Sequence, residues 1–278
     1  MPPRPRLPVL HVLNLAGFSS PRSFDILSQL RIEEAIFRAD PLQRNWLILN
    51  QGMVEHGRKV VFGLGDSRRP ETLCDVTAAR KDGVQLIKRF SGGGTVFVDE
   101  NTTFLTFICN EDILVQNEGL VEKEVLNFPR PIMDWTGQVY RGGFDRIMGT
   151  ASHGFALQEN DYVFGKRKFG GNAQSISKDR WLHHTSNLWT YDSELMGKYL
   201  LMPEKRPDYR EDRTHEAFLC GLSEILPSGT EKDSLSLAIL EELGERWFAL
   251  KHVTEEEFEK IVLQDMVNTE HRRGNKVL

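Results

Sequence analysis

Hydrophobic and polar residues change their spacing along the chain, and these changes predict the order of its elements. Apolar and polar residues alternate over Val9–Leu15, which predicts a first strand. Asp25–Arg38 carries its apolar residues on one face and follows Pro21 and Ser23, where a cap is expected, so this segment predicts a helix. Runs of β-branched and aromatic residues predict further strands over Trp46–Leu49, Lys59–Phe62, Val84–Phe90, Thr95–Val98 and Thr103–Cys109, with a loop and a short helix over 63–83.

The second half of the chain predicts a helix, a group of short strands and then a helical end. Pro131–Ile147 has a helical pattern that Gly142 and Gly143 weaken, and Gly165–Lys166 suits a two-residue hairpin turn. This order predicts an α+β fold in a single domain over 1–278, with a strand-rich core over 1–190 and a helical completion over 191–278. The predicted strands are Gly154–Gln158, Asp161–Phe164, Arg167–Phe169, Asn172–Ser177 and Trp181–Trp189, and the predicted helices are Asp208–Leu226, Ser234–Leu250 and Glu255–Leu263.

Composition and charge narrow the classes of protein that the chain can be. It has 35 Lys and Arg against 40 Asp and Glu, a net charge of −5 that does not suit a protein coating nucleic acid. No window approaches the roughly 20 apolar residues of a membrane-spanning helix, so neither nucleic acid nor membrane is an expected partner. Three cysteines without a C-x-x-C pair fit a reducing compartment. His183 and His184 would point to opposite faces of a strand, so no zinc site is expected there.

The first residues carry a basic bias that leaves the compartment open. Residues 1–24 contain arginines and no acidic residue, as organelle presequences do. The prolines among them would break the amphipathic helix that such a peptide needs. Cytoplasmic, mitochondrial and plastid locations therefore stay open.

Ser91, Gly92, Gly93 and Gly94 stand together between two predicted strands. Three successive glycines are costly to order, because glycine loses the most backbone entropy on folding. One interpretation is a tight turn with a bulge, and the other is a cradle in which peptide N–H groups meet a phosphate or carboxylate. Arg89 would add a permanent positive charge and a two-pronged donor for that anion. The motif is not a P-loop, because no Gly-Lys-Ser/Thr follows.

A second glycine-rich stretch carries three adjacent cations, Lys166, Arg167 and Lys168, before Gly170–Gly171. Lys166 fits a solvated hairpin tip. Arg167 and Lys168 must point to opposite faces of the strand, so one of them faces inward or toward a cleft. A lysine in that place, with Asp161 across the hairpin, would neutralise charge that develops on a phosphate or carboxylate.

Taken in order, these motifs resemble the lipoate–protein ligase A family. The resemblance runs from about residue 9 to residue 215 and is closest to the short, plant-like eukaryotic members. The matching residues are Arg89-x-Ser91-Gly92-Gly93-Gly94-x-Val96-Phe97-x-Asp99, then Asn160-Asp161, then Gly165-x-Arg167-Lys168-x-Gly170-Gly171-x-Ala173, and then His183-His184-Thr185.

The resemblance implies an α+β fold with mixed β-sheets, shared with biotin ligases and octanoyl transferases. Members activate lipoate with ATP and Mg²⁺ to lipoyl-AMP and pass the acyl group to one lysine of a lipoyl domain. By motif, Lys168 and Asp161 would be catalytic at the junction of lipoyl carboxyl and phosphate, and apolar strand residues would line the lipoyl tunnel. Arg89 and Gly94–Phe97 would hold the nucleotide. The full set of implied binding residues is Arg89, Ser91, Gly92, Gly93, Gly94, Thr95, Val96, Phe97, Asp99, Asn160, Gly171, Asn172, Ala173, His183 and His184.

The resemblance also implies the partners, which are apo lipoyl domains of 2-oxoacid dehydrogenase E2 subunits or the glycine-cleavage H protein. The chain after Trp189 is as long as the helices that complete such a catalytic domain, so a C-terminal accessory domain is not expected. Some short members need a separate protein for adenylation, which leaves an accessory partner open.

The sequence departs from the family pattern at two positions. Val98 stands where the family commonly has histidine, and Gln174 stands where the bacterial pattern has an arginine, which removes a candidate phosphate contact. The leading hypothesis is an ATP-dependent lipoate–protein ligase. A transferase that uses only lipoyl-AMP and a lipoyl- or adenylate-binding protein without turnover are the alternatives. Retention of Arg89, Asp161 and Lys168 together weighs against the last of these.

Cysteine and histidine positions bear on the neighbouring activities. Octanoyl transfer through a thioester uses a cysteine nucleophile near the lysine hairpin or the histidine strand. Nothing between Cys109 and Cys220 is cysteine, so thioester chemistry is disfavoured, and Cys74 and Cys109 are expected to be buried. One of His183 and His184 is expected to pack within the sheet while the other faces the cleft.

Overall fold

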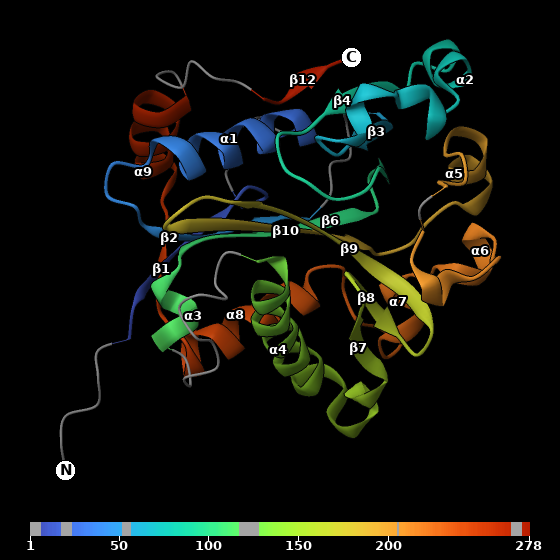
Figure 1. The fold of residues 1–278 in the computed structure, drawn as a ribbon. Coiled ribbons are helices and arrows are strands. Elements are labelled where there is room, and N and C mark those ends of the chain that lie inside the picture. The colour runs from blue at the N-terminus through green and yellow to red at the C-terminus, as the bar shows by residue number, and fades with distance from the viewer. Residues whose placement is uncertain (1–6, 18–23, 52–56, 117–127, 205, 268–273) are drawn as a thin grey trace.

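Two β-sheets of unequal size form the framework of the protein (Figure 1). The computed structural model describes residues 7–17, 24–51, 57–116, 128–204, 206–267 and 274–278. Within these residues the large sheet has eight strands in the order β11-β1-β2-β6-β10-β9-β8-β7, and the small sheet has four in the order β12-β4-β3-β5. The strands are β1 (Val9–Asn14), β2 (Asn45–Asn50), β3 (Lys59–Phe62), β4 (Gln85–Lys88), β5 (Val96–Val98), β6 (Thr102–Asn110), β7 (Phe155–Gln158), β8 (Asp161–Phe164), β9 (Arg167–Ile176), β10 (Arg180–Leu188), β11 (Ala249–His252) and β12 (Lys276–Val277).

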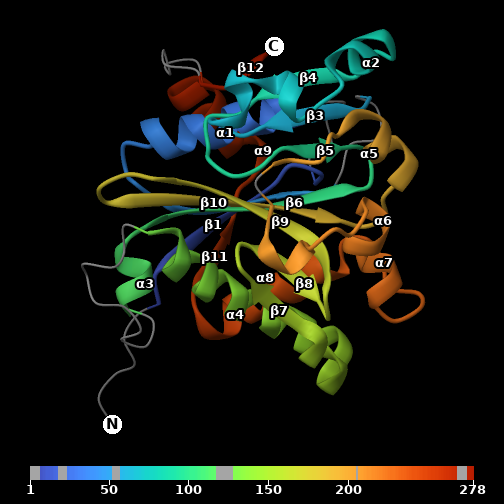
Figure 2. The same cartoon turned by 45° about the vertical axis from the view of Figure 1, so that its right-hand side comes forward.

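Helices cover both faces of the large sheet (Figures 1 and 2). On one face, α4 (Pro129–Met148) and α8 (Ser234–Arg246) pack together over the main apolar core. On the other face lie α1 (Ile26–Ala39) and the helix that starts as α9 (Glu255–Glu257) and continues as a π-helix over Phe258–Val267. The shorter helices are α2 (Val76–Lys81), α3 (Asp112–Gln116), α5 (Ser193–Tyr199), α6 (His215–Phe218) and α7 (Leu222–Ile225), with 3-10 turns at Asp66–Arg68, Pro70–Thr72, Gly149–Gly154 and Asp208–Arg210.

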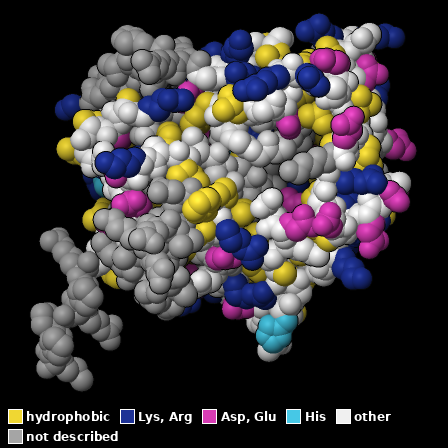
Figure 3. Space-filling view, in the orientation of Figure 1, with side chains coloured by type: hydrophobic (Ala, Val, Ile, Leu, Met, Phe, Trp, Pro, Cys, Tyr) yellow, Lys and Arg dark blue, Asp and Glu magenta, His cyan; other side chains and the backbone are white. Residues whose placement is uncertain are grey.

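The surface carries charges of both signs. On the face shown in Figure 3, Asp and Glu side chains are interspersed with Lys and Arg. In the part of the chain that the structure describes, no helix is both long and apolar enough to span a membrane.

Gly142 and Gly143 explain how α4 and α8 approach each other closely. A Cβ on Gly142 would lie 2.4 Å from the side chain of Glu242, and one on Gly143 would lie 2.7 Å from Ile239. The helix predicted over Pro131–Ile147 is therefore confirmed with slightly wider bounds. The glycines that lower its intrinsic propensity make room for its neighbour.

The start of α1 differs from the predicted cap. The Asp25 carboxylate accepts a hydrogen bond from the Ser28 backbone N–H at 2.7 Å and caps the helix. Pro21 and Ser23, where the sequence predicts the cap, lie outside the described residues.

The C-terminal part is less helical than the sequence predicts. The helix predicted over Ser234–Leu250 ends at Arg246, and β11 then pairs in parallel with β1 at the edge of the large sheet. The helix predicted over Asp208–Leu226 is instead a 3-10 turn followed by α6 and α7. In addition, β12 pairs with β4 and adds a strand to the small sheet. The predicted α+β class is confirmed, but the segment 191–278 contributes strands as well as helices.

Strands β8, β9 and β10 form the part of the large sheet that carries the charged hairpin. Two strands were predicted where β9 runs continuously, because Gly170 and Gly171 stay extended and paired with β10. Gly165, with a φ of 62°, makes the predicted turn between β8 and β9. A register shift after Tyr162 sets Asp161 opposite Gly171.

The segment Ser91–Gly94 does not form a tight turn between paired strands. Its flanking strands β4 and β5 lie on opposite sides of β3 in the small sheet. The Gly92 N–H donates to the Gln174 carbonyl oxygen of β9 at 2.9 Å, which ties the segment to the large sheet. The tight-turn interpretation is therefore wrong, and we call Ser91–Gly94 the glycine loop that joins the two sheets.

Candidate functional site

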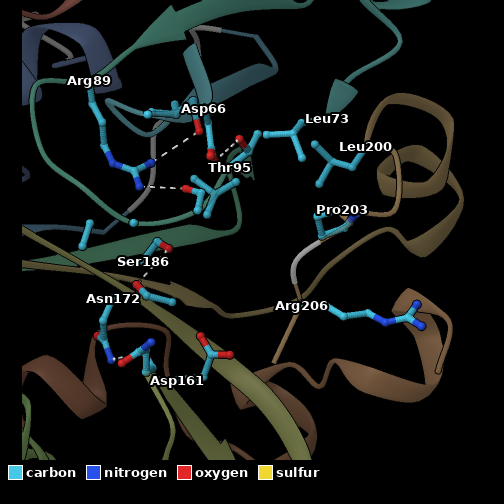
Figure 4. Close-up of a pocket in the computed structure, with 18 of the residues that line it drawn as sticks. Asp66, Leu73, Arg89, Thr95, Asp161, Asn172, Ser186, Leu200, Pro203 and Arg206 are labelled. Atoms are coloured by element: carbon cyan, nitrogen blue, oxygen red, sulfur yellow. Dashed lines mark hydrogen bonds between the residues drawn. The ribbon is translucent and has the colours of Figure 1, made fainter. Parts of the chain in front are cut away.

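A cleft of about 1010 Å³ lies where the glycine loop meets the large sheet (Figure 4). One wall consists of the glycine loop and the neighbouring loop that carries Asp66. Strands β8, β9 and β10 form a second wall, from which Asp161, Asn172 and Ser186 project. A third side is bordered by Leu200, Leu201, Pro203, Glu204, Arg206, Pro207 and Arg210, of which Figure 4 labels Leu200, Pro203 and Arg206.

Lys168 and Asp161 form an ion pair on the large-sheet wall. Lys168 Nζ lies 2.8 Å from Asp161 Oδ1, and the Tyr209 hydroxyl donates to Oδ2 of the same carboxylate at 2.9 Å. The Lys168 side chain is 25% exposed, whereas that of Asp161 is 9% exposed. Arg167 pairs instead with Glu224 at 2.9 Å and does not line the cleft. The expectation that one of the two adjacent cations faces a cleft is confirmed.

Tyr209 holds Asp161 in place as a neutral donor. Burial and the charge of Asp161 raise the pKa of the Tyr209 hydroxyl well above its ordinary value. The Arg213 guanidinium lies over the Tyr209 ring and donates to the Lys166 carbonyl oxygen at 2.8 Å. Because an ammonium has three N–H donors and Asp161 takes one, Lys168 has donors for an anionic ligand.

Arg89 lies beneath the glycine loop and donates to the backbone. Its Nη2 donates to the carbonyl oxygens of Gly92 at 2.9 Å and Gly94 at 2.7 Å, and its Nη1 donates to that of Val61 at 3.4 Å. Arg89 is 3% exposed, and burial lowers the pKa of its guanidinium to about 10, so it is still a cation at neutral pH. The two-pronged donor expected for an anion is thus occupied by carbonyl oxygens.

Gly93 brings the glycine loop against β9. Its φ is 95°, and a Cβ would lie 2.8 Å from Arg89 Nη2 and 2.9 Å from the Asn172 carbonyl oxygen. A Cβ on Gly63 would come 1.9 Å from the Gly93 carbonyl oxygen. The need for glycine here therefore comes from close backbone approach and from a positive φ.

Apolar side chains from α1 and from the strands nearby line another portion of the cleft. Ile26, Leu30, Val61, Val98 and Phe104 pack in one cluster, and all five border the cleft. Val98, at which the sequence departs from the pattern of the resemblance, adds apolar surface to this wall.

His184 borders the cleft beside this apolar cluster, and Glu33 orients it. His184 Nδ1 lies 3.0 Å from both carboxylate oxygens of Glu33. Thr106 and Gln29 each donate to Glu33 Oε1 at 2.7 Å, so the buried carboxylate is well supplied with partners. His184 is the histidine of the pair that faces the cleft.

His183 lies in the core between the sheet and α4. Its ring nitrogens lie 3.0 Å from Gln174 Nε2 and 3.1 Å from Thr185 Oγ1. Burial, with the neighbouring His184, lowers the pKa of His183 to about 3, so its ring is neutral. The division between one packed and one cleft-facing histidine is confirmed, but His183 does not line the cleft, contrary to its implied binding role.

Most of the expected site residues meet at the cleft. Five do not line it, and two of these have clear structural roles. Phe97 stacks on Tyr199 at 5.8 Å, and Asp99 accepts a hydrogen bond from the Asn101 N–H in the turn to β6. Those that line it are Arg89, Gly93, Gly94, Thr95, Val96, Asn160, Asp161, Lys168, Gly171, Asn172, Ala173 and His184, and those that do not are Ser91, Gly92, Phe97, Asp99 and His183.

Several charged residues that line the cleft were not predicted as site residues. Asp66, Arg68 and Arg69 come from the loop before α2, and Arg210 comes from the segment predicted as a long helix. Asp66 accepts a hydrogen bond from the Thr95 hydroxyl at 2.8 Å. The charged run at 66–69 was visible in the sequence, but no periodicity connects a loop to a distant site.

All three cysteines of the chain are buried, and none lines the cleft. Burial raises the pKa of the Cys220 thiol to about 11, and the thiol donates to the Arg167 carbonyl oxygen at 3.5 Å. Burial likewise raises the pKa of Cys74 to about 11 and that of Cys109 to about 12. Protonated, buried thiols are poor nucleophiles, which agrees with the expectation against thioester chemistry.

The mixed sheets packed with helices match the fold of lipoate–protein ligase catalytic domains. The family model of the lipoyl protein ligase A/B catalytic domain matches residues 25–244. The chain therefore belongs to this family, and the resemblance drawn from its motifs is confirmed.

Individual relatives are distant in sequence and similar in fold. The inactive lipoate–protein ligase 2 of Plasmodium falciparum is 27% identical over 267 residues, covering 78% of this chain and 67% of the relative. A bipartite lipoate protein ligase of Thermoplasma acidophilum, described with its E2 lipoyl domain, has a TM-score of 0.66 at 17% identity and covers 95% of this chain and 93% of its own. A lipoate–protein ligase A bound with ATP has a TM-score of 0.64 at 18% identity, and the match covers 95% of this chain and 97% of that ligase.

Proposed function

We propose that this protein is an ATP-dependent lipoate–protein ligase, which forms lipoyl-AMP and transfers the lipoyl group to a lysine of a lipoyl domain. The observation that carries the proposal is the Lys168–Asp161 pair, 2.8 Å apart, on the wall of a cleft that also has an apolar portion. An acyl-adenylate needs both features, because it joins an apolar chain to a phosphate through a carboxyl group.

The apolar cluster would hold the acyl chain. Ile26, Leu30, Val61, Val98 and Phe104 offer aliphatic and aromatic surface from α1 and the strands around it. Burying an apolar chain there is favourable by about 25 cal/mol per Å² of surface removed from water. This term would give the cleft its affinity for a lipoyl or an octanoyl chain.

Lys168 would act electrostatically in both chemical steps. In activation, a lipoate carboxylate oxygen bonds to the α-phosphorus of ATP, and pyrophosphate leaves. In transfer, the acceptor amine attacks the acyl carbon, AMP leaves with the bonding electron pair, and the amine proton goes to water. The ammonium of Lys168 would stabilise the negative charge on the phosphate and carboxyl oxygens in each step. The nucleophile belongs to the acceptor, so Lys168 is not consumed.

Magnesium would arrive with the nucleotide. Mg²⁺ prefers one or two carboxylates together with phosphate oxygens and waters. Asp66 supplies a carboxylate on the cleft wall beside Thr95. In the described part of the chain, no group of three or more His, Cys, Asp or Glu side chains could hold a metal ion. This donor set fits an ion held mainly by phosphate, whose charge it would partly neutralise.

The acceptors that we propose are apo lipoyl domains of 2-oxoacid dehydrogenase E2 subunits or of the glycine-cleavage H protein. Support comes from the T. acidophilum ligase, which is described with its E2 lipoyl domain. The lysine of the acceptor would enter the cleft near Lys168.

A second candidate keeps only the transfer from lipoyl-AMP, with adenylation left to a separate protein. Arg89 favours it, because the guanidinium expected to hold the nucleotide is bonded to the glycine-loop carbonyl oxygens. Gln174, where the bacterial pattern has an arginine as a candidate phosphate contact, is bonded to His183 at 3.0 Å. The P. falciparum relative, named as an inactive ligase, agrees with this candidate.

The test is the intact mass of a purified apo lipoyl domain after incubation with the protein. One arm contains lipoate, ATP and Mg²⁺, and the other contains lipoyl-AMP. A domain with its acceptor lysine replaced by arginine is the control. Modification in both arms is the result expected of a ligase, and modification with lipoyl-AMP alone identifies the transferase. An unmodified domain in both arms contradicts both candidates.

A further inference from the structure

Arg210 occupies an unusual place on the border of the cleft. It ends the 3-10 turn Asp208–Arg210 and is only 6% exposed. Its guanidinium carbon lies 4.6 Å from the centroid of the Phe218 ring, and its Nε donates to the Arg213 carbonyl oxygen at 3.4 Å. The Phe218 ring and the Arg213 carbonyl group therefore hold the Arg210 side chain in place.

The buried Nη2 nitrogen of Arg210 has no hydrogen-bond partner among the described residues. Other buried nitrogens share this condition, but Arg210 is the residue among them that lines the cleft. Leaving a buried cationic donor without a hydrogen bond costs free energy. A ligand that brings an acceptor oxygen to this donor recovers that free energy as binding.

The charges around Arg210 do not neutralise it. Arg210 forms no ion pair with a carboxylate in the described part of the chain. Asp161 is already held by Lys168 and Tyr209, and Arg206 is paired with Asp212 at 2.5 Å. Burial and the nearby Arg206 lower the pKa of Arg210, which reflects a cation short of negative partners.

Arg210, on the third side of the cleft, is linked through Phe218 to the strand that carries Lys168. Phe218, which lies beneath the Arg210 guanidinium, is followed by Leu219, and Leu219 forms a β-bridge with Lys168. The Cys220 N–H donates to the Lys168 carbonyl oxygen at 2.9 Å, which fixes α6 to β9. The backbone therefore connects the two cations through a short, ordered segment.

We propose that Arg210 is a phosphate-binding residue, whose Nη2 donates to a phosphate oxygen of the nucleotide and acts together with Lys168. The inference rests on the proposed function, because it names the group that holds the phosphate at the same cleft. A carboxylate is the other anion that the cleft would meet. The residues that line the cleft include six Lys and Arg (Arg68, Arg69, Arg89, Lys168, Arg206 and Arg210) against four Asp and Glu (Asp66, Glu159, Asp161 and Glu204). This excess of positive charge suits a polyphosphate better than one carboxylate.

The experiment measures the binding of pyrophosphate, ATP, AMP, adenosine and lipoate to the full chain by isothermal titration calorimetry. Arg210→Gln keeps a planar polar head without charge, and Arg210→Lys keeps the charge without the fork. Arg167→Gln is the matched control, since Arg167 pairs with Glu224 away from the cleft. Thermal unfolding of each variant establishes that it is folded before binding is compared.

We expect Arg210→Gln to bind pyrophosphate and ATP about tenfold more weakly or worse, as the loss of one charged hydrogen bond predicts. Arg210→Lys should bind them with intermediate affinity, while adenosine and lipoate bind all variants equally. Equal pyrophosphate and ATP affinity in wild type and Arg210→Gln overturns the role of Arg210, and so does a wild type that binds neither. Selective loss of lipoate binding assigns Arg210 to the carboxylate and overturns the proposal. Pyrophosphate binding that depends on Arg210 in a protein that modifies no lipoyl domain supports the phosphate site and contradicts the proposed function alone.

Discussion

Arg89 and Lys168 both stand beside glycine runs in the sequence, and they line opposite walls of the same cleft. Lys168 is 25% exposed along its side chain, bonded to Asp161, and has donors for a ligand. Arg89 is 3% exposed and donates to the carbonyl oxygens of Gly92, Gly94 and Val61. The same kind of motif therefore serves ligand chemistry on one wall and loop structure on the other.

A cationic side chain beside a run of glycines therefore does not by itself form an anion-binding site. What separates the two is the orientation of nearby carbonyl groups. In the glycine loop the carbonyl oxygens of Gly92 and Gly94 point at the guanidinium and satisfy it. In β9 the carbonyl oxygen of Lys168 accepts a hydrogen bond from the Cys220 N–H, and the Lys168 ammonium pairs with the side-chain carboxylate of Asp161 at the cleft.

The largest expected effect is on stability, from Arg89→Ala. The substitution leaves buried carbonyl oxygens without their donors, and we expect the free energy of unfolding to fall by about 3–5 kcal/mol. Urea unfolding followed by circular dichroism measures it. Arg89→Lys, which keeps one donor group, should recover part of the loss. An unchanged midpoint for Arg89→Ala would mean that the loop does not depend on the guanidinium.

Lys168→Ala should act on chemistry and leave the fold nearly intact. We expect the rate of lipoyl transfer from lipoyl-AMP to fall by about 10²–10³-fold, because a charge positioned for the transition state is lost. The acceptor is followed by intact mass over time. Lys166→Ala, at the exposed tip of the same hairpin, is the matched control and should transfer at the wild-type rate. Normal transfer by Lys168→Ala would refute its electrostatic role.

Gly93→Ala tests the close approach of the glycine loop to β9. The positive φ and the Asn172 carbonyl oxygen, 2.9 Å from the added Cβ, predict a loss of about 2 kcal/mol in unfolding free energy. Gly94→Ala is the control, since a Cβ there meets nothing within 4 Å. Equal stability of the two variants in urea would show that the loop relaxes without cost.

The effect that is smallest at neutral pH concerns the core residue His183, because it appears only on acidification. Its pKa is lowered from 6.5 to about 3 in the folded protein. As the pH falls below 6.5, the unfolded chain takes up a proton that folded His183 refuses, so stability is lost. The contribution is at most about 1.4 kcal/mol per pH unit down to pH 3. His183→Gln should flatten this part of the curve of unfolding free energy against pH, and an identical slope in the variant would contradict the assignment.

Local sequence patterns predicted the strands that are rich in apolar residues and the turn that contains glycine. β1, β2, β3 and β6 and the Gly165 turn were found from periodicity and composition. β11 was missed because Ala249–His252 directly follows the α8 pattern and only pairing with β1 makes it a strand. β12 has two residues, too few for any periodicity, and it exists through β4.

The candidate site was predictable as far as motifs are contiguous. Lys168 and Asp161 line the cleft as the resemblance implies. Strand alternation predicted that one histidine of the adjacent pair would face the cleft, but it did not decide that this would be His184. The hydrogen bonds from Arg89 to the carbonyl oxygens of Gly92 and Gly94 could not be predicted from the sequence, because the directions of these carbonyl groups depend on the path of the loop. Asp66, Tyr209 and Arg210 join from loops far away in the sequence, and contacts between loops follow from the tertiary fold alone.

Transfer per folded molecule, measured side by side for Lys168→Ala and Arg89→Lys, tests the contrast between the two walls most directly. Each variant receives lipoyl-AMP and apo lipoyl domain, and its initial rate by intact mass is divided by the folded fraction from circular dichroism at the same temperature. We predict that folded Lys168→Ala loses transfer, whereas Arg89→Lys transfers at close to the wild-type rate per folded molecule. Retained transfer in Lys168→Ala, or a fully folded Arg89→Lys that does not transfer, would contradict it.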